Sequence, residues 1–379
     1  MDRALRDGYE VHRAALAHGF DVTLLPRQVM EVEDPHGTAK TSFSHGIPQQ
    51  STLAAVTYAQ DARMRRDMVM RAGYNIPTGA TFSIGGSEKA PYRYAERTLG
   101  YPVVIKPAVG DNTIDVLAGI DDEEELRRAI EFLQIPPTER PGYTRAAYAL
   151  TELREPGIKD GRVVVPPGYR FLVEEQVSGD YLRFLVLGGK VINVLHCGEG
   201  PWQTPSEDIR DVTSDVSSHL KEMAAGVAES IPGIGLAAVD LVAKDFHGSA
   251  SADEAMVVEY SERPWLAVQQ SYDPHLAESL AEQILAFGME SIIEEPQVSI
   301  AVEYVLSGSV HPEDLIAVLS SEFNRLGLDS TAEVTDLEMG HITGTLKGSP
   351  ADIAWIMESV LEDQGLGGQR AMLVEQRQV

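Results

Sequence analysis

Cysteine is almost absent from this chain, because Cys197 is the single one among 379 residues. One cysteine cannot form a disulfide within the chain or a structural zinc site by itself. No run of about 18 or more apolar residues is present, so a membrane-spanning helix is not expected. The first seven residues alternate in charge and lack an apolar core, so a secretory signal is not expected either. These absences predict a protein of the reducing cytoplasm.

Basic residues are also scarce, with 31 Lys and Arg against 58 Asp and Glu and a formal net charge of -27. Such a surface repels phosphate backbones and anionic lipids, so neither nucleic acid nor a membrane surface is expected as a partner. The composition is 43% hydrophobic and 23% charged, as in soluble globular proteins.

Hydrophobic periodicity predicts alternating helices and strands over most of the chain. Residues 135–169 are rich in proline, glycine and charge, and they are expected to form a long surface excursion. The expected helices include Leu53–Ala72, Asp121–Leu133, Ser218–Ile231 and Pro274–Phe287. The expected strands include Asp21–Leu25, Tyr101–Pro107, Arg170–Val177, Leu182–Leu187, Lys190–Leu195, Val239–Ala243 and Met256–Tyr260.

The last eighty residues show the clearest pattern. Strands are expected at Val298–Leu306, Thr331–Leu337, Ile342–Leu346 and Arg370–Glu375, with helices at His311–Leu326 and Pro350–Leu361. This βαββαβ order is that of a split-βαβ, ferredoxin-like unit. Glu294, Glu295 and Pro296 are the expected linker before it.

Lys106 ends an apolar strand and is followed directly by Pro107. A lysine at the end of a buried strand faces either water or an anion. For an isolated lysine a solvated strand end is the simpler interpretation, but the acidic residues further along the chain favour an anion.

Asp240 and Glu259 each lie inside an otherwise apolar strand. An unpaired buried carboxylate costs several kcal/mol, so each needs a cationic partner or a metal. Two carboxylates on neighbouring strands with substrate phosphates suit Mg²⁺. The alternative is pairing with arginine, and Arg263 is the nearest arginine in sequence.

The segment from Phe171 to Asp180 could present a backbone edge to a nucleotide base, with an acidic side chain just beyond it for the ribose. By itself this pattern is weak, because acidic hairpins are common.

Taken in order, these motifs resemble the ATP-grasp fold, and most closely the ATP-grasp portion of cyanophycin synthetase and of the bifunctional glutathione synthetase. The resemblance covers about residues 1 to 290. The matching motifs are Ala59-Gln60-Asp61, Arg71-Ala72-Gly73 with Pro77, Pro102 to Pro107, Val173-Glu174 with Gly179 and Arg183, Gly188 to Val191, Val239-Asp240, and Val258-Glu259 with Pro264.

The resemblance implies ATP and Mg²⁺ as cofactors and a role for each matching residue. Lys106 would contact the α- and β-phosphates, Arg66 would contact ATP, and Asp180 would lie near the ribose. Arg183 would face the reacting phosphate or acyl group, since a guanidinium presents a planar fork of donors. The expected adenine-binding hinge is Glu174, Glu175, Gln176 and Val177. The expected metal ligands are Asp240, Glu259 and Ser261.

Three departures from the family pattern are visible. Arg66 stands where the family has a lysine, and Ser261 stands where the family's metal motif has an asparagine. The segment Gly110–Asp115 matches a glycine-rich phosphate-covering loop but contains a single glycine. Glycine lets a backbone bend closely around phosphate. Either this loop closes differently, or substrate or metal compensates, or the site is weakened.

Three further residues are candidates for the substrate pocket: Arg263, His196 and Trp265. Ordinary packing is an equal alternative for His196 and Trp265. The C-terminal unit resembles acylphosphatase in element order, but Tyr304–Ser309 lacks the phosphate-binding arginine of that family. Hydrolysis there is not expected, which leaves packing, homodimer formation or amino-acid sensing.

The sequence therefore predicts an α+β protein with an ATP-grasp fold, in which two α/β lobes sandwich ATP, followed by a ferredoxin-like domain. The expected divisions are 1–95 and 96–180 for the N-terminal and lid subdomains, 181–293 for the metal-binding subdomain, and 297–379 for the appendage. The expected activity is an ATP-dependent carboxylate–amine ligase acting on amino acids or short peptides. The partner domains of the two look-alike enzymes are not found in this chain, so a stand-alone ligase is expected. The alternative is a non-catalytic nucleotide or amino-acid sensor.

Overall fold

The computed structural model describes residues 8–84, 89–109, 115–136, 139–140, 157–164, 169–198, 208–248, 254–289, 295–361 and 365–379. The fold is a mixed α+β fold with several antiparallel sheets, as expected. The chain forms two compact units, one of residues 1–50 with 265–379 and one of residues 51–264. Among the described residues, no helix combines the length and apolar character that crossing a bilayer requires.

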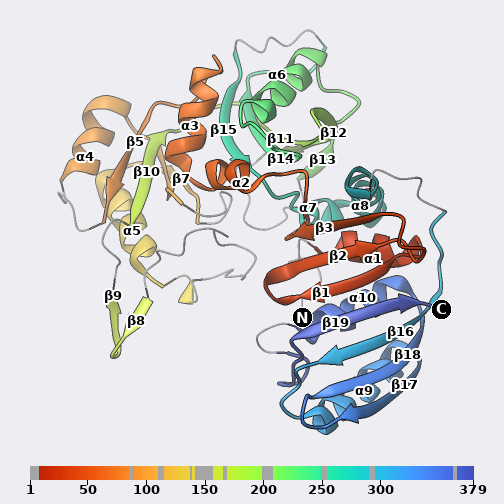
Figure 1. The fold of residues 1–379 in the computed structure, drawn as a ribbon. Helices are drawn as coiled ribbons and strands as arrows, with labels where there is room; N and C mark the ends of the chain where they lie inside the picture. Colours follow the sequence, from red (N-terminus) through yellow and green to blue (C-terminus); the bar gives the residue numbers. More distant parts are fainter. Residues whose placement is uncertain are drawn as a thin grey trace. The chain divides into compact units, whose positions relative to one another are not determined.

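The first unit is built on an eight-stranded sheet in the order β17-β18-β16-β19-β1-β2-β3-β4 (Figure 1). Its N-terminal elements are α1 (Tyr9–Ala17), β1 (Asp21–Leu25), a short 3₁₀ turn (Pro26–Gln28), β2 (Val29–Glu33), β3 (Lys40–Ser44) and β4 (Ile47–Pro48). Its C-terminal elements are α7 (Leu266–Tyr272), α8 (Pro274–Met289), β16 (Ile300–Ser307), α9 (Pro312–Leu326), β17 (Asp329–Asp336), β18 (His341–Gly348), α10 (Pro350–Ser359) and β19 (Leu373–Gln378).

The two ends of the sequence thus share one sheet, because β1 pairs antiparallel with β19. The buried ring of His12 on α1 reinforces this junction, contacting Glu358 on α10 at 3.2 Å and Gln376 on β19 at 2.8 Å. The βαββαβ element order expected for the C-terminal part is present. Its ferredoxin-like and acylphosphatase-like assignment stays a prediction, as does the four-part division of the chain, whose segment 1–95 crosses the boundary between the units.

The second unit contains two larger antiparallel sheets and a hairpin. One sheet has the order β5-β10-β6-β7 and the other β13-β12-β11-β14-β15. The strands are β5 (Gly79–Ser83), β6 (Val103–Pro107), β7 (Leu117–Ile120), β8 (Gly157–Lys159), β9 (Arg162–Val164), β10 (Arg170–Glu175), β11 (Asp180–Leu187), β12 (Lys190–Cys197), β13 (Ile209–Asp211), β14 (Leu236–Ala243) and β15 (Met256–Ser261). The helices are α2 (Leu53–Gln60), α3 (Ala62–Arg71), α4 (Ala90–Tyr94), a π-helical segment (Ala95–Leu99), α5 (Glu123–Gln134) and α6 (Ser218–Glu229).

Each of these two sheets has its own apolar core. In the four-stranded sheet, Ile105 and Phe171 pack with Leu126 and Leu133 of α5. In α5 the Asp122 side chain caps the backbone N–H of Glu125 at 2.8 Å, and three glutamates follow in the first turn, where the helix dipole favours negative charge. In the five-stranded sheet, all eight residues of β14 are buried between β11 and β15, so any polar residue of this strand needs a partner within the protein.

Two expectations need correction. The single helix expected over Leu53–Ala72 is two helices, α2 and α3, because Asp61 is extended at φ −111° and bridges to Val109. The excursion expected over residues 135–169 contains the hairpin β8–β9 in its described part. Most of that excursion, and residues 110–114 of the expected phosphate-covering loop, lie outside the described residues.

Candidate functional site

Lys106 reaches from the four-stranded sheet to β15 of the five-stranded sheet. It lies on β6 and is 4% exposed. Its ammonium group donates to the carbonyl of Val258 at 2.9 Å and contacts a Glu259 carboxylate oxygen at 3.0 Å. It also forms an ion pair with Glu174 at 2.6 Å. The lysine at the strand end therefore faces anionic groups and not solvent.

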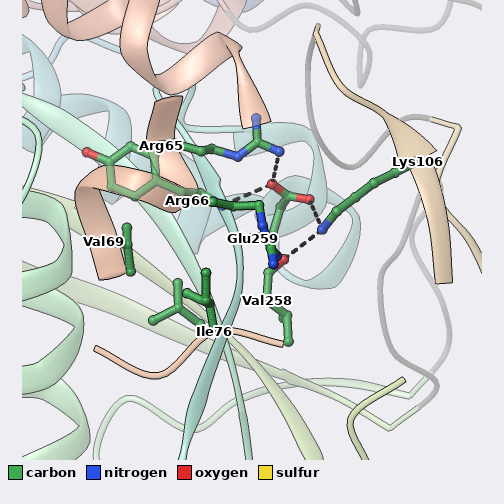
Figure 2. Close-up of a pocket in the computed structure, with 9 residues that line it drawn as sticks. Arg65, Arg66, Val69, Ile76, Lys106, Val258 and Glu259 are labelled. Carbon is green, nitrogen blue, oxygen red and sulfur yellow. Dashed lines mark hydrogen bonds and ion pairs between the residues drawn. The ribbon is translucent and has the colours of Figure 1, made fainter. Parts of the chain in front are cut away.

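Two arginines of α3 complete this network. Arg66 donates to Glu174 at 2.6 Å and to the carbonyl of Pro77 at 2.6 Å. Arg65 donates to Glu259 at 2.7 Å and to the carbonyl of Ala59 at 3.1 Å. Figure 2 shows Glu259 lying between the Arg65 guanidinium and the Lys106 ammonium group.

The two arginines reach this place because the chain breaks at Asp61. The Asp61 side chain caps the start of α3 by accepting from the backbone N–H of Arg63 at 2.9 Å. The backbone N–H of Ala62, the residue before Arg63, donates to the carbonyl oxygen of Ala108, just after β6, at 2.8 Å. This junction ties α3 to the strand that carries Lys106. The buried stripe of α3 is formed by Ala62, Arg65 and Val69, and the last two of these line the pocket described next.

A pocket opens at this network. The space in it that a water-sized sphere can reach is about 20 Å³, room for about one water molecule. Its lining combines three cations, one carboxylate and an apolar wall: Arg65, Arg66, Val69, Ile76, Lys106, Val257, Val258, Glu259 and Tyr260. A pocket of this charge suits an anionic ligand with an apolar or aromatic part.

Asp240 is held by Arg183, on the neighbouring strand β11. Arg183 Nε and Nη2 each donate to one carboxylate oxygen at 2.7 Å, and the Tyr181 hydroxyl donates to the second oxygen at 2.5 Å. Burial and the nearby Asp240 charge raise the Tyr181 pKa well above its ordinary value, so the phenol stays a neutral donor. The pairing of Asp240 and Glu259 with arginine, considered above as an alternative to a metal, is thus present, but with Arg183 and Arg65 and not with Arg263.

The expected magnesium ligands can be tested against these contacts. Asp240 and Glu259 are direct neighbours in the register of β14 and β15. Asp240 is 0% exposed with both oxygens on Arg183, and Ser261 is buried, with its hydroxyl accepting from the backbone N–H of Arg263 at 3.2 Å. Within the described part of the chain, no group of three His, Cys, Asp or Glu residues could hold a metal ion. In this arrangement Asp240, Glu259 and Ser261 do not fit a protein-held magnesium ion.

The expected adenine hinge follows β10. The Glu174 side chain belongs to the cationic network, while Glu175 accepts from the backbone N–H of Thr78 at 2.7 Å. The exposed Gln176 accepts from the backbone N–H of Gly119 at 2.6 Å, and Val177 is half-buried in the loop that follows. The adenine-binding role of this segment stays a prediction.

The remaining expected residues lie outside the Lys106 network. Asp180 pairs with His196 at 3.0 Å, and this ring stacks on Phe246 with centroids 5.2 Å apart. Arg263 is fully buried, 3.8 Å from Glu262. Trp265 belongs to the other compact unit, where it is buried, so its substrate role stays a prediction.

Arg65 is the residue that the sequence interpretation missed. Its signal was present, because Arg65 falls on the same helical stripe as the buried residues Ala62 and Val69. An arginine on a buried stripe requires an acidic partner, and here the partner is Glu259.

No family model matches the chain, and no curated protein matches it. Among solved structures, the chain is similar to a bifunctional glutathione synthetase from Pasteurella multocida, with a TM-score of 0.35, 15% identity and coverage of 66% of this chain and 41% of that one. It is also similar to the D-alanine–D-alanine ligase of Bacillus anthracis complexed with ATP, with a TM-score of 0.40, 14% identity and coverage of 62% and 66%. A third similar structure is the ATP-grasp ligase PsnB complexed with precursor peptide PsnA2 and AMPPNP, with a TM-score of 0.38, 14% identity and coverage of 63% and 61%. The chain thus spans about two fifths of the length of the first structure and no more than 66% of the other two.

Proposed function

We propose that this protein is an ATP-dependent carboxylate–amine ligase of the ATP-grasp kind, with amino acids or short peptides as substrates. The observation that carries the proposal is the pocket in which Lys106, Arg65 and Arg66 meet where the four-stranded sheet approaches β15. Buried cations aimed into a pocket are the protein groups that a polyphosphate requires. The order of motifs along the chain supports the same assignment.

The proposed reaction has two steps. In the first, a carboxylate oxygen of the acid substrate attacks the γ-phosphorus, the bond from phosphorus to the β–γ bridging oxygen breaks, and ADP leaves. In the second, a neutral amine attacks the acyl phosphate carbonyl, inorganic phosphate leaves, and the nitrogen loses a proton to give the amide. The protein supplies no nucleophile, so its contribution is positioning and charge stabilisation.

The network provides this stabilisation by exchanging partners. Lys106 is shared by Glu174 and Glu259, and Arg66 also holds Glu174. On binding, phosphate oxygens would replace part of the carboxylate contacts of Lys106 and Arg66. The glutamates would still position the side chains of the two cations, and the positive charge of these cations would stabilise the phosphate oxygens.

The test is a screen of amino-acid pairs for ADP release, with Lys106→Met as the control for the site. A ligase sustains ADP release over repeated turnovers only when the acid and the amine are both present, and Lys106→Met should abolish that release. ADP release that needs neither substrate, or that survives in Lys106→Met, would contradict the proposal.

A second candidate is a nucleotide-binding sensor without catalysis. The observation that favours it is the pairing of Asp240 with Arg183, which occupies both carboxylate oxygens of an expected magnesium ligand. A sensor would raise its melting temperature with ATP and release no ADP with any substrate pair.

A further inference from the structure

The Arg183–Asp240 pair occupies a position where the ligase proposal expects a metal ligand. The guanidinium contacts are bidentate, at 2.7 Å each, and Arg183 and Asp240 are 2% and 0% exposed. To ligate a metal, Asp240 would have to give up a buried charge-assisted pair, which leaves the arginine uncompensated. Among the described residues that line the pocket, Glu259 is present and Asp240 is not.

Glu259, the carboxylate that does line the pocket, is also engaged by cations. One oxygen accepts from Arg65 at 2.7 Å and from the backbone N–H of Tyr260 at 3.1 Å. The other oxygen accepts from Lys106 at 3.0 Å. A magnesium ion placed there would lie beside two protein cations, and their repulsion weakens its binding.

The ion-pair chain of the pocket carries an excess of positive charge. It runs from Arg65 through Glu259, Lys106 and Glu174 to Arg66, so three cations share two carboxylates. This leaves one net positive charge for an incoming anion. A nucleotide without metal carries more negative charge than its magnesium complex, and it therefore gains more from this excess.

We infer that the pocket binds the nucleotide's phosphates through Arg65, Arg66 and Lys106 and that this binding does not require a divalent metal ion. The inference rests on the proposed function, since it assumes a nucleotide in this pocket. Arg65 is the most important of the three cations, because its guanidinium contacts the Glu259 carboxylate where a divalent ion would otherwise bind.

The experiment is isothermal titration of the full chain with ATP, once in excess EDTA and once in saturating magnesium at the same ionic strength. The inference predicts that the two dissociation constants agree within about threefold or that binding is tighter in EDTA. A loss of about tenfold or more in EDTA overturns the inference and leaves the proposed function standing. No binding in either buffer overturns both.

Arg65→Met provides an independent comparison. This substitution removes the cation from one Glu259 oxygen while Lys106 keeps the other, so ATP binding by the variant should become stronger in magnesium than in EDTA. Arg71→Met is the matched control, because Arg71 lies on the same helix with its side chain 73% exposed and paired with Asp67. Equal metal dependence in the wild type, Arg65→Met and Arg71→Met would contradict the role of Arg65.

Discussion

At the scale of single residues, the structure of the site depends on the ion-pair partner of each buried carboxylate. Lys106, Glu174, Arg66 and Glu259 could all be named from the sequence, because each breaks an apolar pattern or belongs to a recognisable motif. Their partners could not be named, since a partner depends on the register between strands. Asp240 meets Arg183 because the two residues are directly opposite on β14 and β11, which no local pattern specifies.

Removing one member of the Arg183–Asp240 pair should destabilise the folded state. Asp240→Ala leaves a buried guanidinium without its carboxylate, and we expect the free energy of unfolding to fall by about 3–5 kcal/mol. Urea unfolding measured by circular dichroism checks this. Asp67→Ala is the control, since it removes an exposed pair with Arg71 and should cost no more than about 0.5 kcal/mol. Equal effects of the two substitutions would show that the buried pair is not structurally important.

Asp61 should make stability depend on pH. Burial alone would raise its pKa, but hydrogen bonds from Arg63 outweigh burial and lower the pKa below the ordinary 3.8. The ionised form therefore stabilises the folded state above about pH 3.8, and this contribution disappears as the pH falls through the lowered pKa. Asp61→Asn keeps an acceptor for the cap but does not titrate. The difference in unfolding free energy between the wild type and Asp61→Asn should thus shrink on acidification, and a difference independent of pH would refute the assignment.

At the scale of elements, local periodicity predicted most helices and strands, but not where they break or what they pair with. Asp61, in the middle of an apolar-periodic run, divides the expected helix into α2 and α3. The break was not evident from propensity, because the extended conformation of Asp61 depends on its bridge to Val109, a contact 48 residues away along the chain. The helix that begins after this break carries Arg65, whose contact with Glu259 was not predicted.

The pairing of β5 with β10 requires a glycine at position 79. Gly79 lies opposite Glu174, and a Cβ there would be 2.8 Å from the Glu174 Cβ and 3.0 Å from the Val173 carbonyl oxygen. Gly79→Ala should lower the free energy of unfolding by about 1–3 kcal/mol and weaken ATP binding, because Glu174 must move away from Lys106 and Arg66.

Gly157→Ala is the matched control for this substitution. Gly157 also begins a strand, and no atom of the described residues lies within 4 Å of a Cβ placed there. Urea unfolding and ATP titration of both variants decide the point. An ATP affinity unchanged in Gly79→Ala would mean that Glu174 does not position the phosphate-binding cations.

At the scale of the whole molecule, the main feature that local patterns did not predict is the shared sheet of the two chain ends. The pairing of β1 with β19 joins residues at least 350 positions apart, and only tertiary packing specifies it. The composition, in contrast, indicated a strongly acidic surface. A net charge of -27 implies strong repulsion between surface carboxylates at low salt.

Salt should therefore stabilise this protein. Raising the ionic strength from about 0.01 M to about 1 M shortens the Debye length from about 30 Å to about 3 Å and screens this repulsion. We expect the melting temperature in sodium chloride to rise over this range in a calorimetric scan. A melting temperature that falls steadily with salt would show that attractive surface ion pairs dominate instead.

The central claim is that Lys106 and its neighbours form a nucleotide phosphate site. Its most direct test is calorimetric titration of ATP into the wild type, Lys106→Met and Arg71→Met. We expect one ATP per chain for the wild type and Arg71→Met, and a dissociation constant at least about tenfold weaker for Lys106→Met, equivalent to about 1.4 kcal/mol or more. Equal affinities in the wild type and Lys106→Met, or no binding by any of the three, would contradict it.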